Sequence, residues 1–170
     1  MDGPPAHLHF SRRRRAGNAD SSTAPTPALL ATIGYEGASL DAFLRTLQRA
    51  RIDCVVDIRE LPLSRRPGFS RTPLRAALGQ LGIAYRHERG LGAPRALRQA
   101  LRRDADLGRF FSGYRRHLRA RRALVARLAA ELRGRVALLC YERDPARCHR
   151  SLVAEALRRR WRIPCRHLFA

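Results

Sequence analysis

The eleven residues 140–150, near the carboxyl end of the chain, contain five side chains that could take part in chemistry. They are Cys140, Glu142, Cys148, His149 and Arg150. An apolar run precedes this stretch at 136–139, and a helical pattern follows it at 151–160. Thiol, carboxylate, imidazole and guanidinium groups can act as nucleophile, general base, proton donor and anion ligand. The spacing therefore predicts a chemical site at the turn between a buried strand and a helix.

Cys148 is the first candidate for a nucleophile. A thiol in the first turn of a helix, beside His149 and Arg150, is expected to have a lowered pKa. If Asp144 caps the helix and Pro145 opens it, Cys148 moves to the end of the first turn and the helix dipole acts on it less. A packed or hydrogen-bonded thiol is the alternative to catalysis. His149 is either a general acid or base, or a donor to a backbone carbonyl.

The same residues include ligand types that zinc prefers. Cys140, Cys148 and His149 could bind one ion, with Glu142 or His87 as the fourth ligand. The spacing is not that of a Cys-x-x-Cys knuckle, and neighbouring Cys and His ligands strain a single centre. We therefore assign no residue to a metal and require no cofactor, and zinc or another divalent cation stays an open alternative. A cysteine phosphatase or sulfurtransferase loop is excluded, because neither Cys140 nor Cys148 is followed six residues later by Arg.

Arginine supplies all 35 basic residues of the 170-residue chain, against 14 acidic residues, for a net charge of +21. The absence of lysine excludes a P-loop and a Schiff-base mechanism. Such a charge attracts polyanions, and guanidinium groups match phosphate oxygens in pairs, so nucleic acid or a nucleotide is a candidate partner. A strong codon bias toward Arg and Ala would produce the same composition without such a partner.

Four cysteines without a secretory signal are typical of reduced, intracellular thiols. No apolar run approaches the roughly 18 residues that cross a bilayer. We therefore expect a soluble, cytoplasmic protein that makes no membrane contact. The sequence predicts no oligomeric state.

The chain divides into a tail and one folded region. Residues 1–27 are rich in Pro, Ser and Gly, contain four Arg and two acids, and are predicted to be disordered. From residue 28 to 170, short apolar runs alternate with helical patterns, including one long helix at 109–132. This alternation predicts a single α/β domain with a three-layer, mostly parallel, doubly wound (Rossmann-like) sheet covered by helices on both faces. We expect the strand order 3-2-1-4-5.

The unusual polar residues all follow the ends of predicted strands. In an open parallel sheet, ligands bind beyond the carboxyl ends of the strands, where the strand order reverses. Catalytic roles are predicted for Glu142, Cys148, His149 and Asp57. Substrate contacts are predicted for Gly34, Tyr35, Glu36, Gly37, Arg59, Ser64, Arg65, His87 and Arg150. The alternative for the carboxylates is that they pair with arginines and neutralise a crowded edge.

Several short motifs link the chain to a known family. They are Ile33 to Gly37, Val56 to Arg59 with Pro62, Ser64 and Arg65, Tyr85 to His87 with Leu91 and Gly92, Cys140 to Glu142, and Cys148 to Arg150. In these stretches, residues 30–168 resemble the DUF488 family of prokaryotic proteins, whose function is unknown. The resemblance implies an α/β fold and a shared site, and it implies no reaction.

We therefore expect an α/β protein that acts as a hydrolase or group transferase on a phosphate-bearing substrate, such as a nucleotide or nucleic acid. Arg59 and Arg150 would hold the anion, Glu142 or Asp57 would act as base, and Cys148 with His149 would supply a nucleophile or a proton. The alternative is a module that binds nucleic acid or a nucleotide without catalysis. A third interpretation is a site for a small metabolite.

Overall fold

Strands and helices alternate along the chain in the computed structural model, which describes residues 27–170. The strands are β1 (Leu29–Gly34), β2 (Cys54–Asp57), β3 (Ala84–His87), β4 (Arg135–Cys140) and β5 (Cys165–Phe169). The helices are α1 (Leu40–Arg49), α2 (Arg71–Gln80), α3 (Arg95–Asp104), α4 (Leu107–Arg119), α5 (Arg122–Glu131) and α6 (Arg150–Trp161), with 3₁₀ turns η1 (Arg89–Leu91) and η2 (Pro145–Arg147). The tail predicted to be disordered, 1–27, lies outside the described residues except for its last position.

All the strands run parallel, in the order β3-β2-β4-β1-β5. The predicted order 3-2-1-4-5 is wrong, because β4 rather than β1 lies beside β2, and β5 pairs with β1. Burial distinguishes the inner strands from the edges but does not order the inner ones. Residues 30–34 of β1 and 136–140 of β4 are buried alike, whereas β3 and β5 keep partly exposed positions and form the edges.

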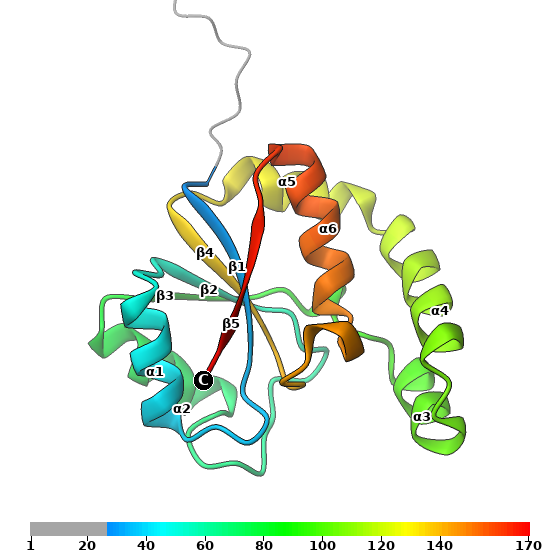
Figure 1. Cartoon of the computed structure of the whole chain (residues 1–170), viewed down its shortest axis with the longest axis horizontal. Coiled ribbons are helices and arrows are strands. Elements are labelled where there is room, and N and C mark those ends of the chain that lie inside the picture. Colours follow the sequence, from blue (N-terminus) through cyan, green and yellow to red (C-terminus); the bar gives the residue numbers. More distant parts are fainter. Residues whose placement is uncertain (1–26) are drawn as a thin grey trace, which may run out of the picture.

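The sheet separates two apolar cores, as the doubly wound class requires. Successive residues of β4 point to opposite faces, so Val136 and Leu138 join one core while Ala137 and Leu139 join the other. On one face, α1 and α2 bury the side chains Phe43, Leu47, Leu74 and Leu78. On the other face, α4, α5 and α6 bury Tyr114, Leu128, Val153 and Leu157. Figure 1 shows α1 and α2 on one side of the sheet and α4 and α6 on the other. The three-layer, parallel α/β fold is confirmed.

The long helix predicted at 109–132 is instead two helices, α4 and α5, separated at residues 120–121. Arg121 N–H donates to the Leu118 carbonyl, an i to i−3 bond that tightens the chain and ends the α-helical pattern. A break this short leaves the spacing of apolar residues almost unchanged, so hydrophobic periodicity cannot reveal it. Other signals were accurate: the Ser39 hydroxyl accepts a hydrogen bond from Ala42 N–H and caps α1 as predicted.

Within residues 27–170, no helix combines the length and the apolar character that crossing a bilayer requires.

Candidate active site

A pocket of about 500 Å³ opens beyond the carboxyl ends of the three inner strands. Its floor contains Cys140, Glu142 and His149. Its walls carry the arginines Arg59, Arg65, Arg66, Arg98 and Arg102, and its apolar lining includes Leu61, Leu63, Leu101, Phe110 and Tyr141. The pocket therefore lies where parallel α/β sheets bind ligands, and it combines reactive groups with positive charge.

Arg150 holds the loop that carries Glu142. Its side chain is completely buried, and it donates to the backbone carbonyls of Glu142 and Arg143, the latter at 2.8 Å. It also donates from Nε to the hydroxyl of Thr32 on β1, at 3.3 Å. These bonds use all three guanidinium nitrogens inside the protein, so Arg150 shapes the floor of the pocket and does not itself line it.

Gly34 is required where β1 passes this loop. A Cβ atom at this position would lie 1.8 Å from the Glu142 carbonyl oxygen and 2.6 Å from its carbonyl carbon. No side chain fits in this space, so the end of β1 supports the backbone of Glu142 directly. Gly34 therefore allows a close backbone approach, and it does not line the pocket.

Cys148 lies between two helical segments and outside the first turn of α6. Asp144 caps η2 by accepting a hydrogen bond from Ala146 N–H at 2.8 Å, and Cys148 follows η2. His149 then occupies the N-cap position of α6 without a side-chain capping bond. The Cys148 thiol is buried and does not line the pocket. Burial raises its pKa well above the ordinary value, and the neighbouring Cys140 raises it further. The prediction of a lowered pKa at Cys148 is therefore wrong, because loss of hydration outweighs any effect of the helix end.

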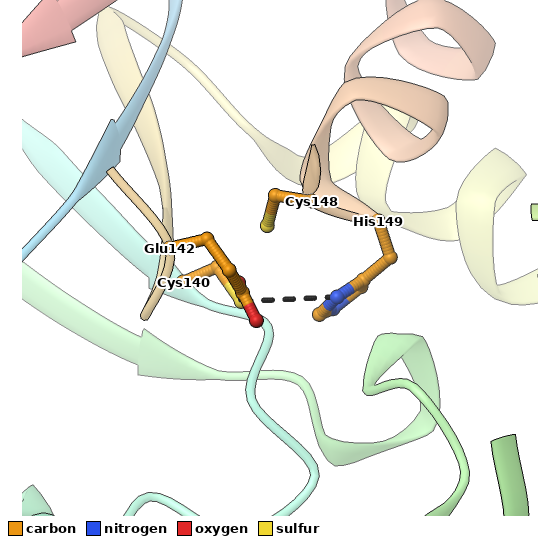
Figure 2. Close-up of side chains that lie close together, drawn as sticks. All are labelled: Cys140, Glu142, Cys148 and His149. Carbon is orange, nitrogen blue, oxygen red and sulfur yellow. Dashed lines mark hydrogen bonds between the residues drawn. The ribbon is translucent and has the colours of Figure 1, made fainter. Parts of the chain in front are cut away.

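Four side chains from this segment meet in one cluster, Cys140, Glu142, Cys148 and His149 (Figure 2). The Cys140 thiol donates to Glu142 Oε2 at 3.1 Å, and Cys140 Sγ lies 3.7 Å from His149 Nδ1. The ligand-type atoms of all four residues lie within 4.8 Å of one another. On its other side, the His149 ring approaches the Ile58 carbonyl through Nε2 at 3.2 Å. A carbonyl only accepts, so Nε2 carries the proton and Nδ1 is free to accept from the cluster.

The cluster shifts the pKa values of its members in different directions. Burial raises the pKa of Glu142, but contacts with the Cys148 and Cys140 thiols and with its own backbone N–H outweigh burial, so its pKa is lowered. The Cys148 thiol lowers the pKa of Cys140, but burial and the Glu142 carboxylate outweigh it, so that pKa is raised. Burial lowers the pKa of His149, while Cys148 and Glu142 raise it above the ordinary value. At neutral pH Glu142 is thus an ionised carboxylate that can accept a proton, facing two protonated thiols.

Asp57 and Arg59 form a buried ion pair beside the pocket. The Arg59 guanidinium donates to both carboxylate oxygens of Asp57, with Nη2 to Oδ2 at 2.6 Å, and Tyr85 Oη donates to the same Oδ2 at 2.7 Å. Arg59 Nη1 also donates to Tyr35 Oη and to the Phe69 carbonyl, each at 2.9 Å. Asp57 does not line the pocket, and its acceptors are occupied, so these contacts give it a structural part rather than that of a base.

The other predicted site residues divide into two groups. Tyr35, Ser64 and Arg65 line the pocket, and the Tyr35 ring stacks on Phe69 with centroids 4.3 Å apart. The remaining residues do not line it. Glu36 accepts from Arg143 N–H at 3.0 Å, Gly37 turns the chain at φ +78, and His87 Nε2 contacts the Arg59 carbonyl at 2.9 Å. The structure therefore brings Glu142, and not His87, to the two cysteines and His149.

Sequence reasoning does not select several residues of the pocket wall. Arg98 and Arg102 are four residues apart on α3, a spacing that predicts a shared helix face. Periodicity does not reveal that this face lies over the strand ends, because the path of α3 depends on its packing against α4. The apolar residues Leu61 and Leu63 are 52% and 74% exposed at the pocket, and Tyr141 is 43% exposed. Large apolar side chains that remain exposed to water beside a polar pocket are typical of a binding site, and this exposure identifies the three residues as part of the pocket wall.

The fold and the pocket define a doubly wound α/β protein with a mixed thiol, carboxylate and imidazole site at its strand ends. The chain belongs to the DUF488 family, because the family model described as "Domain of unknown function DUF488" matches residues 39–157. This match spans β2, β3 and β4 and the whole of the Cys140 to His149 segment. Comparison with curated proteins gave no match, and comparison with solved structures gave none either.

Proposed function

We propose that the protein is a hydrolase acting on a phosphate-bearing substrate of the nucleotide class, held in the pocket at the ends of β1, β2 and β4. The observation that carries the proposal is the pocket itself, in which Glu142 and His149 lie on the floor and four further arginines, besides Arg59, line the walls. An apolar or basic pocket alone would suggest binding only. The ionised carboxylate on the floor adds a group that can activate water.

The arginine walls favour an anion as the substrate. Arg65 and Arg102 are exposed, and among residues 27–170 neither has a carboxylate partner within salt-bridge distance. Arg66 Nε is buried in the pocket wall and has no hydrogen-bond partner within the described part of the chain. Arg98 is paired with Glu60. Free guanidinium donors around one pocket match phosphate oxygens, which accept such bonds in pairs.

The apolar side of the pocket favours a substrate with a planar, weakly polar portion. Leu61, Leu63 and Tyr141 expose large apolar surface there. The Tyr141 ring is held edge-on against Tyr35, with centroids 5.3 Å apart, so its position is fixed before any ligand binds. A nucleobase stacks favourably on such a surface, whereas a free inorganic anion gains nothing from it.

Water is the nucleophile in the proposed reaction, since Cys148 is buried behind the pocket and its pKa is raised. Glu142 accepts a proton from water, and the water oxygen forms a bond to phosphorus. The bond between phosphorus and the leaving oxygen breaks, and the proton held by Glu142 passes to that oxygen. The wall arginines stabilise the negative charge on the phosphoryl oxygens in the transition state.

The test is a turnover assay with the full chain and a panel of nucleoside mono-, di- and triphosphates and short single-stranded oligonucleotides. Glu142→Gln should abolish turnover and keep binding. Glu155→Gln should leave turnover unchanged, because Glu155 is a partly exposed carboxylate on α6 that pairs with Arg158 and Arg159. Arg102→Ala should raise KM, with the neighbouring Arg103→Ala as its control, because Arg103 does not line this pocket.

Two results would overturn the proposal. If wild-type protein binds members of the panel with salt-dependent affinity, shows no turnover, and Glu142→Gln binds equally well, the chain is a non-catalytic binding module. If nothing in the panel binds at moderate salt, the phosphate-bearing class of substrate is wrong.

A further inference from the structure

The cluster of Cys140, Glu142, Cys148 and His149 consists of polar and ionisable side chains at a buried position where packing alone would favour apolar ones. Both thiols and the imidazole are almost completely buried. A packing role would be served by alanine, valine or leucine, which bring no polar atoms to be satisfied. Four groups that share the ability to bind a metal instead point their donor atoms toward one another (Figure 2).

We propose that Cys140, Cys148 and His149 bind one zinc ion, with Glu142 beside the fourth coordination position. Zinc takes thiolate sulfur at about 2.3 Å and imidazole nitrogen at about 2.0 Å in a tetrahedron, which places neighbouring ligand atoms about 3.3–3.8 Å apart. Cys140 Sγ and His149 Nδ1 are 3.7 Å apart, within that range. Although Cys148 and His149 are neighbours in sequence, their donor atoms and those of Cys140 and Glu142 lie within 4.8 Å of one another, so small side-chain movements bring them to bonding distance.

The surroundings of His149 are those of a metal ligand. A ligating histidine usually donates its second ring N–H to a carbonyl or carboxylate, which fixes the tautomer and the ring orientation. Here Nε2 faces the Ile58 carbonyl at 3.2 Å, so Nδ1 is left as an acceptor and faces Cys140.

The surroundings of the cysteines also fit. The backbone N–H of Arg150 donates to Cys148 Sγ at 3.5 Å, so it would stabilise the negative charge on this sulfur once zinc has displaced the thiol proton. The Arg150 guanidinium binds the Glu142 carbonyl, and within residues 27–170 it has no carboxylate at salt-bridge distance. Two thiolates would cancel the charge of the zinc ion, and the Glu142 carboxylate would then balance the buried charge of Arg150. The site would be electrically neutral as a whole.

The open fourth position would face the pocket. Cys140, Glu142 and His149 line the pocket, whereas Cys148 lies behind them, so zinc would sit between Cys148 and the pocket space. Three protein ligands with a free fourth position are typical of catalytic zinc, while structural zinc usually has four protein ligands. The metal site does not depend on the proposed hydrolysis. If both hold, zinc and Glu142 would act on the same water.

Metal analysis of the full chain tests the inference. The purified protein is expected to contain one zinc per chain, and after removal of zinc it should bind one equivalent of cobalt(II) with the charge-transfer absorption of a cobalt–thiolate centre. Cys148→Ser and His149→Gln should lose stoichiometric zinc and that absorption. Cys54→Ser and Cys165→Ser are the controls, because these half-buried cysteines lie at the starts of β2 and β5 and should keep both signals.

Glu142→Gln separates this inference from the proposed function. It should keep the zinc and the cobalt spectrum while losing turnover. A wild-type protein that binds neither zinc nor cobalt would overturn the metal site, even if the chain hydrolyses a nucleotide. So would a Cys140–Cys148 disulfide as the stable form under reducing conditions. Both results are measured on wild-type protein, so they test the metal site even if a variant fails to fold.

Discussion

Replacing Gly34 with alanine tests whether the backbone of the β4 loop is fixed by β1. The new Cβ would lie 1.8 Å from the Glu142 carbonyl oxygen, and ordinary contact begins at 3.4 Å, so one of the two backbones must move by the difference, about 1.6 Å. A flexible side chain could move away at little cost, but here both partners are main chain. The loop is also held by Arg150, so the movement would disturb the bonds of a buried guanidinium.

Two opposing effects determine how much Gly34→Ala changes the free energy of unfolding. Overpacking of this kind costs about 1–3 kcal/mol of the free energy of unfolding. Alanine also restricts the unfolded chain more than glycine does, which returns about 0.4–1 kcal/mol. Because both contacting groups are main chain, the cost lies at the upper end of this range, so Gly34→Ala should destabilise the protein by about 2–3 kcal/mol and should displace Glu142 in the pocket floor.

Urea unfolding followed by circular dichroism measures this change, with Gly79→Ala as the matched control. Gly79 lies in α2, and a methyl group added there would have no other atom within 4 Å, so alanine should raise the free energy of unfolding by about 0.5–1 kcal/mol. The two glycine substitutions are thus expected to have opposite signs. A Gly34→Ala protein as stable as the wild type, with unchanged turnover, would refute the close backbone contact.

Three other measurements address different parts of the molecule. Asp57→Asn should lower the free energy of unfolding by about 3–5 kcal/mol in urea titrations, because it leaves the buried Arg59 charge without its partner; a loss below about 1 kcal/mol would contradict that pairing. Burial, with a smaller effect of Arg150, lowers the pKa of His167 below its ordinary 6.5, so the unfolded chain takes up this proton more readily. The contribution of neutral His167 to the free energy of unfolding is therefore complete above pH 6.5 and is lost as the pH falls below it. His167→Gln should make the free energy of unfolding less dependent on pH in that range, and a variant with the same pH dependence as the wild type would argue against the shift. Burial raises the pKa of Cys165 to about 11, so at pH 8 this residue should carry on the order of a hundredfold less thiolate than an ordinary cysteine. Alkylation followed by peptide mass spectrometry should therefore show a slow reaction of Cys165 at pH 8, with a rate that rises with pH up to about 11.

The sequence is sufficient to predict the fold class and the end of the strands at which the candidate site lies. Apolar runs and caps such as Ser39 depend on local chemistry, so the strands and most helices can be located from them. The convergence of strand ends follows from the parallel class alone, which is why Tyr35, Glu142 and His149 are correctly expected near one another. The predicted order places β1 where the structure has β4, and because these two strands are equally buried, their apolar runs do not show which of them pairs with β2.

The roles of individual charged residues cannot be predicted in the same way. A buried arginine and a surface arginine look alike in sequence, so Arg150 is expected to bind substrate, although it binds carbonyl groups of its own chain. The predicted shift at Cys148 has the wrong sign for a related reason: the depth at which the thiol is buried is set by tertiary packing, which the sequence does not show. The Cys-x-Glu spacing at Cys140 is the most direct sequence signal for the cluster, since it places both side chains on one side of an extended chain.

The floor and the walls of the pocket come from separate stretches of the chain. Residues 140–149 supply the floor, while 59–66 and 93–102 supply most of the walls. Mutation in the wall segments can therefore retune which molecules are admitted without touching the groups beneath them. Relatives that keep the floor but differ in those two segments would then share one chemistry across different substrates, and swapping the segments between relatives would exchange their preferences.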